Sequence, residues 1–165
     1  MNFSIGPDPG EAVKQARKFA FNSLKIRNRS EQEIRVYLIK KKCSPEVIAE
    51  VIPYLQKAQL LNDRQFARDW IRMRLRKPWG IRRIFFELQH KGIEPEVLKE
   101  EIAAATEDYS SQETLTELAA KRIEKYKNLD GEKAKKRLFQ YLAQRGFDLG
   151  DVKKVVGKLY DRQRN

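Results

Sequence analysis

The sequence has few of the residues that form disulfides, bind metals or break helices. It contains one cysteine, Cys43, and one histidine, His90, among 165 residues. A single cysteine cannot form an internal disulfide, which favours a cytoplasmic location. The glycines and prolines are sparse, and most of them lie between the predicted helices or at their ends. Valine and isoleucine recur at helical spacing and not in alternation, so no β-strand is predicted.

Several classes of protein are disfavoured by what is missing. No apolar run approaches the roughly 18 residues that a membrane span needs. Residues 1–10 carry no lysine or arginine before an apolar segment, so they are not a signal peptide. We find no glycine-rich phosphate loop, no catalytic grouping and no metal-binding spacing, so neither an enzyme nor a cofactor is predicted. We interpret His90 as a solvated histidine at a helix end, and Cys43 as a small buried hydrophobe, not a nucleophile.

The abundant residues are basic. The net charge is +12, which exceeds the magnitude of ~2–8 that solubility alone favours. Residues 11–58 carry 11 basic and 5 acidic side chains, residues 59–105 carry 10 and 7, and residues 106–165 carry 14 and 10. Because the excess is spread along the chain, it predicts a polyanionic partner such as nucleic acid. The alternative is a basic surface that only contacts solvent.

Hydrophobic periodicity and capping residues predict nine helices. Ser30 with Glu33, and Asn62 with Gln65, have the spacing of helix N-terminal capping boxes. Gly92 and Gly146 have the placement of left-handed C-terminal caps. The predicted ranges are 11–26, 30–42, 45–58, 63–76, 80–91, 95–105, 111–127, 131–145 and 149–162.

The apolar pattern repeats with a period of about 50 residues. The first set, Ile34, Leu38, Cys43, Pro45, Val47 and Ile48, recurs as Ile84, Leu88, Ile93, Pro95, Val97 and Leu98. A further 54 residues along, the positions Leu88, Gly92, Ile93, Leu98 and Ile102 recur as Leu142, Gly146, Phe147, Val152 and Val156. This period predicts an all-α protein of three tandem three-helix repeats that form an elongated, curved array.

The repeats are assigned to residues 11–58, 59–106 and 107–162, after a flexible N-terminus at residues 1–10. The first repeat departs from the pattern, because Lys42 stands where the others have glycine. That turn either places a lysine at positive φ or takes another shape.

The segment from residue 61 to residue 93 carries the most specific signal. Phe66, Trp70 and Met73 form an apolar stripe that we expect to face the core. Arginines at every fourth position from residue 64 to residue 76 repel one another, and two more oppose the dipole in the first turn of the next helix. An anionic partner would relieve both costs. The predicted partner- or DNA-binding residues are Arg64, Arg68, Arg72, Arg74, Arg76, Lys77, Trp79, Arg82 and Arg83.

Trp79 has two interpretations. It could stack on a base or on a partner side chain, or it could fix the corner between the predicted helices at 63–76 and 80–91.

The same segment resembles the central signature of the RecX family. The matching residues are Leu61-Asn62-Asp63, Phe66-Ala67-Arg68, Trp70, Arg72, Gly80, Arg82-Arg83-Ile84, Glu87-Leu88 and Lys91-Gly92-Ile93. The first repeat of that family is matched upstream by Arg29-Ser30, Glu33, Arg35, Leu38 and Lys41, and its third repeat downstream by Leu142 and Arg145-Gly146-Phe147. The resemblance covers about residues 12–160, and Lys42 is the main departure.

The resemblance implies a non-enzymatic regulator in DNA recombination, repair and the SOS response. RecX proteins lie in the groove of the RecA filament on DNA and inhibit its ATPase, strand-exchange and coprotease activities. They also bind single- and double-stranded DNA. We therefore expect a cytoplasmic monomer whose main partner is the RecA filament.

Two other functions are compatible with the residues. Three-helix units also carry helix-turn-helix DNA readers, but residues 45–58 and 95–105, which would be the reading helices, are acidic to neutral. An RNA-binding or ribosome-associated adaptor is a third possibility.

Overall fold

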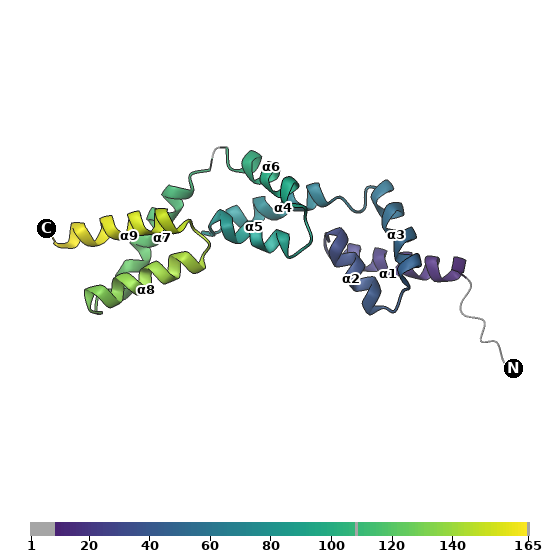
Figure 1. Ribbon diagram of the computed structural model, residues 1–165, viewed down its shortest axis with the longest axis horizontal. Coiled ribbons are helices and arrows are strands. Elements are labelled where there is room, and N and C mark those ends of the chain that lie inside the picture. Colours follow the sequence, from purple (N-terminus) through teal and green to yellow (C-terminus); the bar gives the residue numbers. More distant parts are fainter. Residues whose placement is uncertain (1–8, 108, 165) are drawn as a thin grey trace. The chain divides into compact units, whose positions relative to one another are not determined.

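A computed structural model describes residues 9–107 and 109–164. These residues form nine α-helices and one short 3-10 helix, with no strand among them (Figure 1). In chain order the helices are α1 (Pro9–Ile26), α2 (Glu31–Lys40), α3 (Pro45–Lys57), α4 (Asp63–Leu75), α5 (Ile81–Gln89), α6 (Pro95–Ala105), α7 (Ser111–Ile123), η1 (Glu124–Tyr126), α8 (Gly131–Gln144) and α9 (Leu149–Arg164). The prediction of an all-α chain is confirmed. The flexible N-terminus predicted for residues 1–10 falls mostly outside the described residues.

Helix starts follow the capping residues of the sequence. The Ser30 hydroxyl accepts from the Glu33 amide, and the Glu33 carboxylate accepts from the Ser30 amide, which completes a capping box. The Asn62 side chain accepts from the amide of Gln65 at the start of α4. The Asp148 side chain accepts from the Gly150 and Asp151 amides at the start of α9. Local hydrogen bonding therefore determines where these helices begin.

The described residues fall into two compact units. The first contains the chain up to Ala67 together with His90–Glu94, and the second contains Arg68–Gln89 together with the chain from Pro95. In the first unit, α1 packs against α2 and α3. The core there is formed by Val13, Ala16, Ala20, Ile34, Leu38, Ile48, Val51, Ile52, Leu55 and Leu61.

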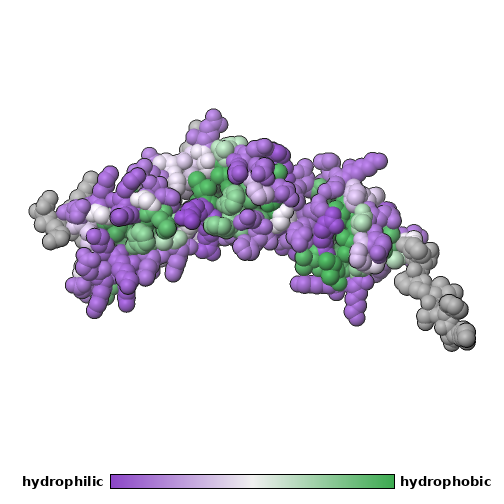
Figure 2. Space-filling view, in the orientation of Figure 1, coloured by the Kyte–Doolittle hydropathy of each residue, from purple (hydrophilic) through white to green (hydrophobic). Residues whose placement is uncertain are grey.

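In the second unit, α5 packs against α6, and α7, α8 and α9 pack against one another. The core of these last three helices is formed by Leu115, Ala119, Ile123, Leu138, Leu142, Phe147, Val152, Val155 and Val156. Figure 2 shows hydrophilic side chains over much of the visible face. The bounds assigned to the three repeats divide the sequence in another way and stay a prediction.

The three equivalent turns have the same backbone conformation for different reasons. Lys42, Gly92 and Gly146 all have positive φ, at 62°, 80° and 82°. A Cβ on Gly92 would lie 2.4 Å from the Cβ of Gln32, and one on Gly146 would lie 2.4 Å from the Cβ of Arg83. These two positions require glycine for space as well as for conformation. Lys42 is exposed, so it bears only the strain of its positive φ.

Two expectations about the core are wrong. Met73 is 45% exposed, while Ala67 and Ile71 are fully buried. The buried face of α4 therefore runs through Phe66, Ala67 and Ile71. Cys43 is only partly buried, at the edge of the first core. No helix in the described part of the chain has the length and apolar content to cross a membrane.

Candidate interaction surface

Arg68 is held inside the second unit by an acid on another helix. Its Nε donates to Oε2 of Glu101 at 2.8 Å, and its Nη2 donates to Oε1 at 3.1 Å. Glu101 lies on α6 and is 4% exposed. Because a buried carboxylate needs a partner, this two-point contact ties α4 to α6. The first role of Arg68 is therefore structural.

Glu87 on α5 engages a group of side chains around α4. Its carboxylate accepts from Nε1 of Trp70 at 3.1 Å and from Nε of Arg83 at 3.1 Å. It also forms an ion pair with Nε of Arg74 at 2.7 Å. The guanidinium of Arg74 lies 4.8 Å from the centre of the Trp70 ring. One carboxylate therefore neutralises two of the predicted site arginines.

The repulsion predicted between arginines of this segment is relieved within the protein at Arg68, Arg74 and Arg83. The spacing argument considers only neighbours three or four residues apart on one helix. The acids that compensate Arg68 and Arg74 come instead from α5 and α6, at least 13 positions away in the sequence. Only tertiary packing brings them together, so helical spacing gave no sign of them.

Four other cations of the predicted set remain open to a partner. Arg72, Arg76, Lys77 and Arg82 are exposed, and they have no carboxylate partner among the described residues. We call these four residues the basic corner. They lie from the last turn of α4 to the first turn of α5, and Arg82 opposes the dipole at the start of α5. Arg64 is exposed in the first unit.

Trp79 lies where two parts of the second unit meet. The Gly80 amide donates to the carbonyl of Arg145 at 2.8 Å, and Nη1 of Arg83 donates to the carbonyl of Gln144 at 3.3 Å. The guanidiniums of Arg83 and Arg145 lie 3.9 Å and 4.3 Å from the centre of the Trp79 ring. Trp79 therefore connects α5 with the end of α8, a wider role than fixing one helix corner.

Sequence reasoning missed four residues near Trp79. The guanidinium of Arg145 also lies 5.0 Å from the Tyr141 ring, and that of Arg122 lies 4.1 Å from Tyr141 and 5.3 Å from Tyr126. Tyr141 with Arg145, and Arg122 with Tyr126, are each four residues apart on the chain. That spacing places side chains on the same helix face, so the two pairs were a usable signal in the sequence.

The first unit contains a separate ionic cluster around Glu33. The carboxylate accepts two hydrogen bonds from Arg27, at 2.9 Å and 3.0 Å, and one from Nζ of Lys91 at 2.7 Å. Burial raises the pKa of Glu33, but the hydrogen bonds and charges of Arg27 and Lys91 outweigh it and lower the pKa to about 2. The hydroxyl of Ser30 donates to the Lys91 carbonyl at 2.6 Å. This cluster holds residues 90–94 against the start of α2.

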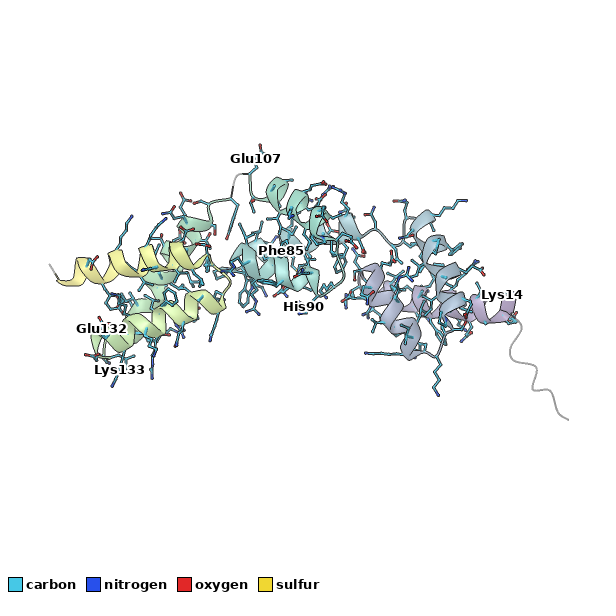
Figure 3. All side chains as sticks on the ribbon, in the orientation of Figure 1. Lys14, Phe85, His90, Glu107, Glu132 and Lys133 are labelled. Carbon is cyan, nitrogen blue, oxygen red and sulfur yellow. The ribbon has the colours of Figure 1, made fainter. Side chains whose placement is uncertain are left out.

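The described residues include no grouping of histidine, cysteine or carboxylates that would hold a metal ion. His90 is exposed just after α5 (Figure 3). Burial raises the pKa of the Cys43 thiol, which disfavours the nucleophilic thiolate.

Comparisons with known proteins identify related sequences and folds. Family models for the first, second and third three-helix domains of RecX match residues 16–55, 62–101 and 108–156. Regulatory protein RecX of Amycolatopsis mediterranei is 33% identical over 151 residues, which cover 90% of this chain and 85% of the relative. Regulatory protein RecX of Prosthecochloris aestuarii is 34% identical over 148 residues, covering 89% and 95%.

A solved structure gives the same fold. RecX from Lactobacillus salivarius superposes with a TM-score of 0.77 at 21% sequence identity, over 91% of this chain and 97% of that one. The matched domains follow one another along the chain, as three tandem three-helix units require.

Proposed function

Because this chain belongs to the RecX family of regulatory proteins, we propose that it binds the RecA filament on DNA and inhibits its ATPase, strand-exchange and coprotease activities. It acts as a monomer in the cytoplasm and also binds DNA weakly and without sequence preference. The prediction of a regulator and not an enzyme is confirmed by the names of its relatives.

The basic corner is the observation that supports this function best. Arg72 lies in the last turn of α4, and Arg76 and Lys77 follow directly after that helix, so like charges gather at its end and repel one another. Arg82, in the first turn of α5, adds an unfavourable interaction with the helix dipole of about 0.3–1 kcal/mol. Both costs disappear when an anionic surface contacts the four cations. A RecA filament on DNA offers such a surface through phosphates and carboxylates.

The basic corner also fits a contact that leaves the fold unchanged. The arginines that stabilise the second unit, Arg68, Arg74 and Arg83, have carboxylate partners within it. The cations of the basic corner have none among the described residues. Removing them therefore tests binding separately from folding.

The test is a variant in which Arg72, Arg76, Lys77 and Arg82 are all replaced by alanine. It should keep the helical circular dichroism of the parent. Its melting temperature should fall by no more than that of an ordinary surface variant. The concentration needed for half-inhibition of RecA ATPase on single-stranded DNA should rise by at least about tenfold, which corresponds to ~1.4 kcal/mol.

A matched control changes the net charge by the same amount elsewhere. The control replaces four exposed lysines of the second unit, Lys125, Lys133, Lys136 and Lys153, by alanine. The concentration for half-inhibition should change by less than about threefold, because general charge effects are small compared with a specific contact. Equal losses from the two variants would show that only net charge matters.

A further inference from the structure

The second unit holds an aromatic ring between two arginines. The centre of the Trp79 ring lies 3.9 Å from the guanidinium of Arg83 and 4.3 Å from that of Arg145. The amide of Gly80 donates to the carbonyl of Arg145 at 2.8 Å. The partly buried ring therefore occupies the space between the start of α5 and the end of α8.

The first unit has the same framework without the ring. The counterparts of Trp79, Gly80, Arg83 and Arg145, at offsets of 50 and 54 residues, are Arg29, Ser30, Glu33 and Lys91. The Ser30 hydroxyl donates to the Lys91 carbonyl at 2.6 Å, which matches the contact of Gly80 with Arg145. Glu33 and Lys91 form an ion pair at 2.7 Å. An arginine therefore stands before α2 at the position that a tryptophan takes before α5.

A cavity of about 310 Å³ lies at this place in the first unit. We call it the Arg29 cavity. Its lining includes Arg29, Glu33, Val36, Tyr37, Lys40 and Lys91. His90, labelled in Figure 3, also lines it. Val36 is 39% exposed, so the cavity presents an apolar side chain that a ligand would cover.

The charges around the cavity are unbalanced. Nε of Arg29 is buried and has no hydrogen-bond partner, and no carboxylate or ring contacts its guanidinium in the part of the chain that the structure describes. Lys40 is exposed and also lacks a carboxylate partner there. The Glu33 carboxylate is already bound by Arg27 and Lys91. A partly buried guanidinium without an acceptor costs free energy, and a bound anion would remove that cost.

We propose that the Arg29 cavity binds an aromatic group that carries a carboxylate, with Arg29 and Lys40 binding the carboxylate. The guanidinium fork of an arginine matches the two oxygens of a carboxylate. The ring packs on Tyr37 and Val36, near the place that corresponds to Trp79 in the second unit. The volume is at the lower end of the ~300–1,000 Å³ range of ligand sites, so it fits one ring system with a short acidic arm.

This inference goes beyond the proposed function. It concerns the first unit and shares no residue with the basic corner. Binding in the Arg29 cavity is measured without RecA or DNA, so it can fail while inhibition through the basic corner holds, and the reverse. A ligand that binds only the folded chain also raises the melting temperature, which gives a second readout.

The test titrates the full chain with indole-3-acetate, an indole ring with a short acidic arm, by isothermal titration calorimetry. We expect saturable binding with a Kd of about 1 mM or lower. Arg29→Gln should weaken binding by at least about tenfold. The control Lys57→Gln, which removes an exposed cation at the end of α3, should weaken it by less than about threefold. Equal losses in the two variants, or no saturable binding up to about 10 mM, would overturn the proposal.

The repeat supplies a second variant. Arg29→Trp places the tryptophan of the second unit at the matching position of the first, where its indole should fill the cavity. This variant should lose the binding of indole-3-acetate and melt no lower than the parent, because filling a cavity with a side chain that fits it is stabilising. A folded Arg29→Trp variant that binds indole-3-acetate as well as the parent would overturn the proposal.

Two related compounds test the chemistry of the ligand. Indole-3-acetamide has the ring without the charge, and it should bind at least about tenfold more weakly than indole-3-acetate. Acetate has the charge without the ring, and an equal concentration of it should not displace indole-3-acetate. Equal binding of the amide, or displacement by acetate, would overturn the proposal.

A ring with a carboxylate occurs both in free aromatic acids and at the end of a polypeptide whose last residue is tryptophan. The peptide acetyl-glycyl-glycyl-tryptophan, with a free carboxylate, separates these two sources. A Kd at least about tenfold lower than that of indole-3-acetate would assign the site to the end of a partner chain, and any higher value would assign it to a free acid. Failure of both compounds to bind would overturn the proposal.

Discussion

Replacing Arg68 by alanine should destabilise the protein, although Arg68 belongs to the set first predicted to bind a partner. The change removes both hydrogen bonds to the Glu101 carboxylate, which is 4% exposed, whereas the Arg68 side chain is 41% exposed. Breaking a fully buried pair costs ~3–5 kcal/mol and breaking an exposed pair ~0–1 kcal/mol. With one partner buried and the other half-exposed, we expect a loss of about 2–3 kcal/mol.

Thermal unfolding followed by circular dichroism measures this loss. For a chain of this length, it corresponds to a melting temperature lower by about 5–10 °C. Arg72→Ala is the matched control, because Arg72 lies one turn further along α4, is exposed and has no carboxylate partner among the described residues. It should change stability by at most about 0.5 kcal/mol.

A double variant tests the mechanism of the destabilisation. Replacing Arg68 and Glu101 together by leucine removes the buried charge along with its partner, and such replacements are often neutral. The double variant should therefore be more stable than Arg68→Ala. The reasoning is refuted if Arg68→Ala melts like the parent, or if the double variant is the less stable of the two.

Three further predictions concern other parts of the chain. The pKa of Glu33 is lowered to about 2 in the folded protein, below its unfolded value near 4.3. The ionised carboxylate therefore stabilises the fold above pH 4.3, by up to about 3 kcal/mol, and this contribution is lost as the pH falls toward 2. The melting temperature measured between these pH values should show that loss in the parent and not in Glu33→Gln. The same dependence on pH in both proteins would assign the loss of stability to other groups. Lys42→Gly should raise the free energy of unfolding in denaturant by about 0.5–1 kcal/mol, because it relieves a positive φ of 62°. Gly92→Ala should lower it. A Lys42→Gly variant less stable than the parent would show that Lys42 is not strained. Small-angle scattering should give a radius of gyration clearly above the ~15 Å of a compact chain of this length, and a value near 15 Å would rule out the elongated array.

Helix positions were predictable from the sequence because local interactions determine them. Capping by Ser30, Asn62 and Asp148 acts within a few residues, so the sequence shows it directly. The 3-10 turn at Glu124–Tyr126 replaces the last predicted turn of the helix before it, since helix ends depend on tertiary contacts as well. Met73 was misplaced because periodicity alone did not distinguish two neighbouring apolar faces of α4.

The candidate site was predictable only in part. The sequence identifies a basic segment, but it does not show which cations are paired, because Glu87 and Glu101 approach α4 only in the folded chain. Arg68 and Arg74 therefore looked the same as Arg72, whereas the pairing of Arg83 with Glu87, four residues further along α5, was visible as a helical spacing. Around Trp79, the contact of Tyr141 with Arg145 was visible as a spacing of four residues, whereas the contact of Trp79 with Arg145 depends on tertiary packing.

The most direct measurement of the central claim is ATP hydrolysis by preformed RecA filaments on single-stranded DNA, titrated with this protein. We predict that hydrolysis falls in a saturable way at protein concentrations below that of RecA, and that the basic-corner variant needs at least about tenfold more protein for the same effect. The assay should contain more DNA binding sites than RecA and this protein together can occupy. Competition between the two proteins for DNA then cannot cause the decrease in hydrolysis. Hydrolysis that stays unchanged over the titration would contradict the account.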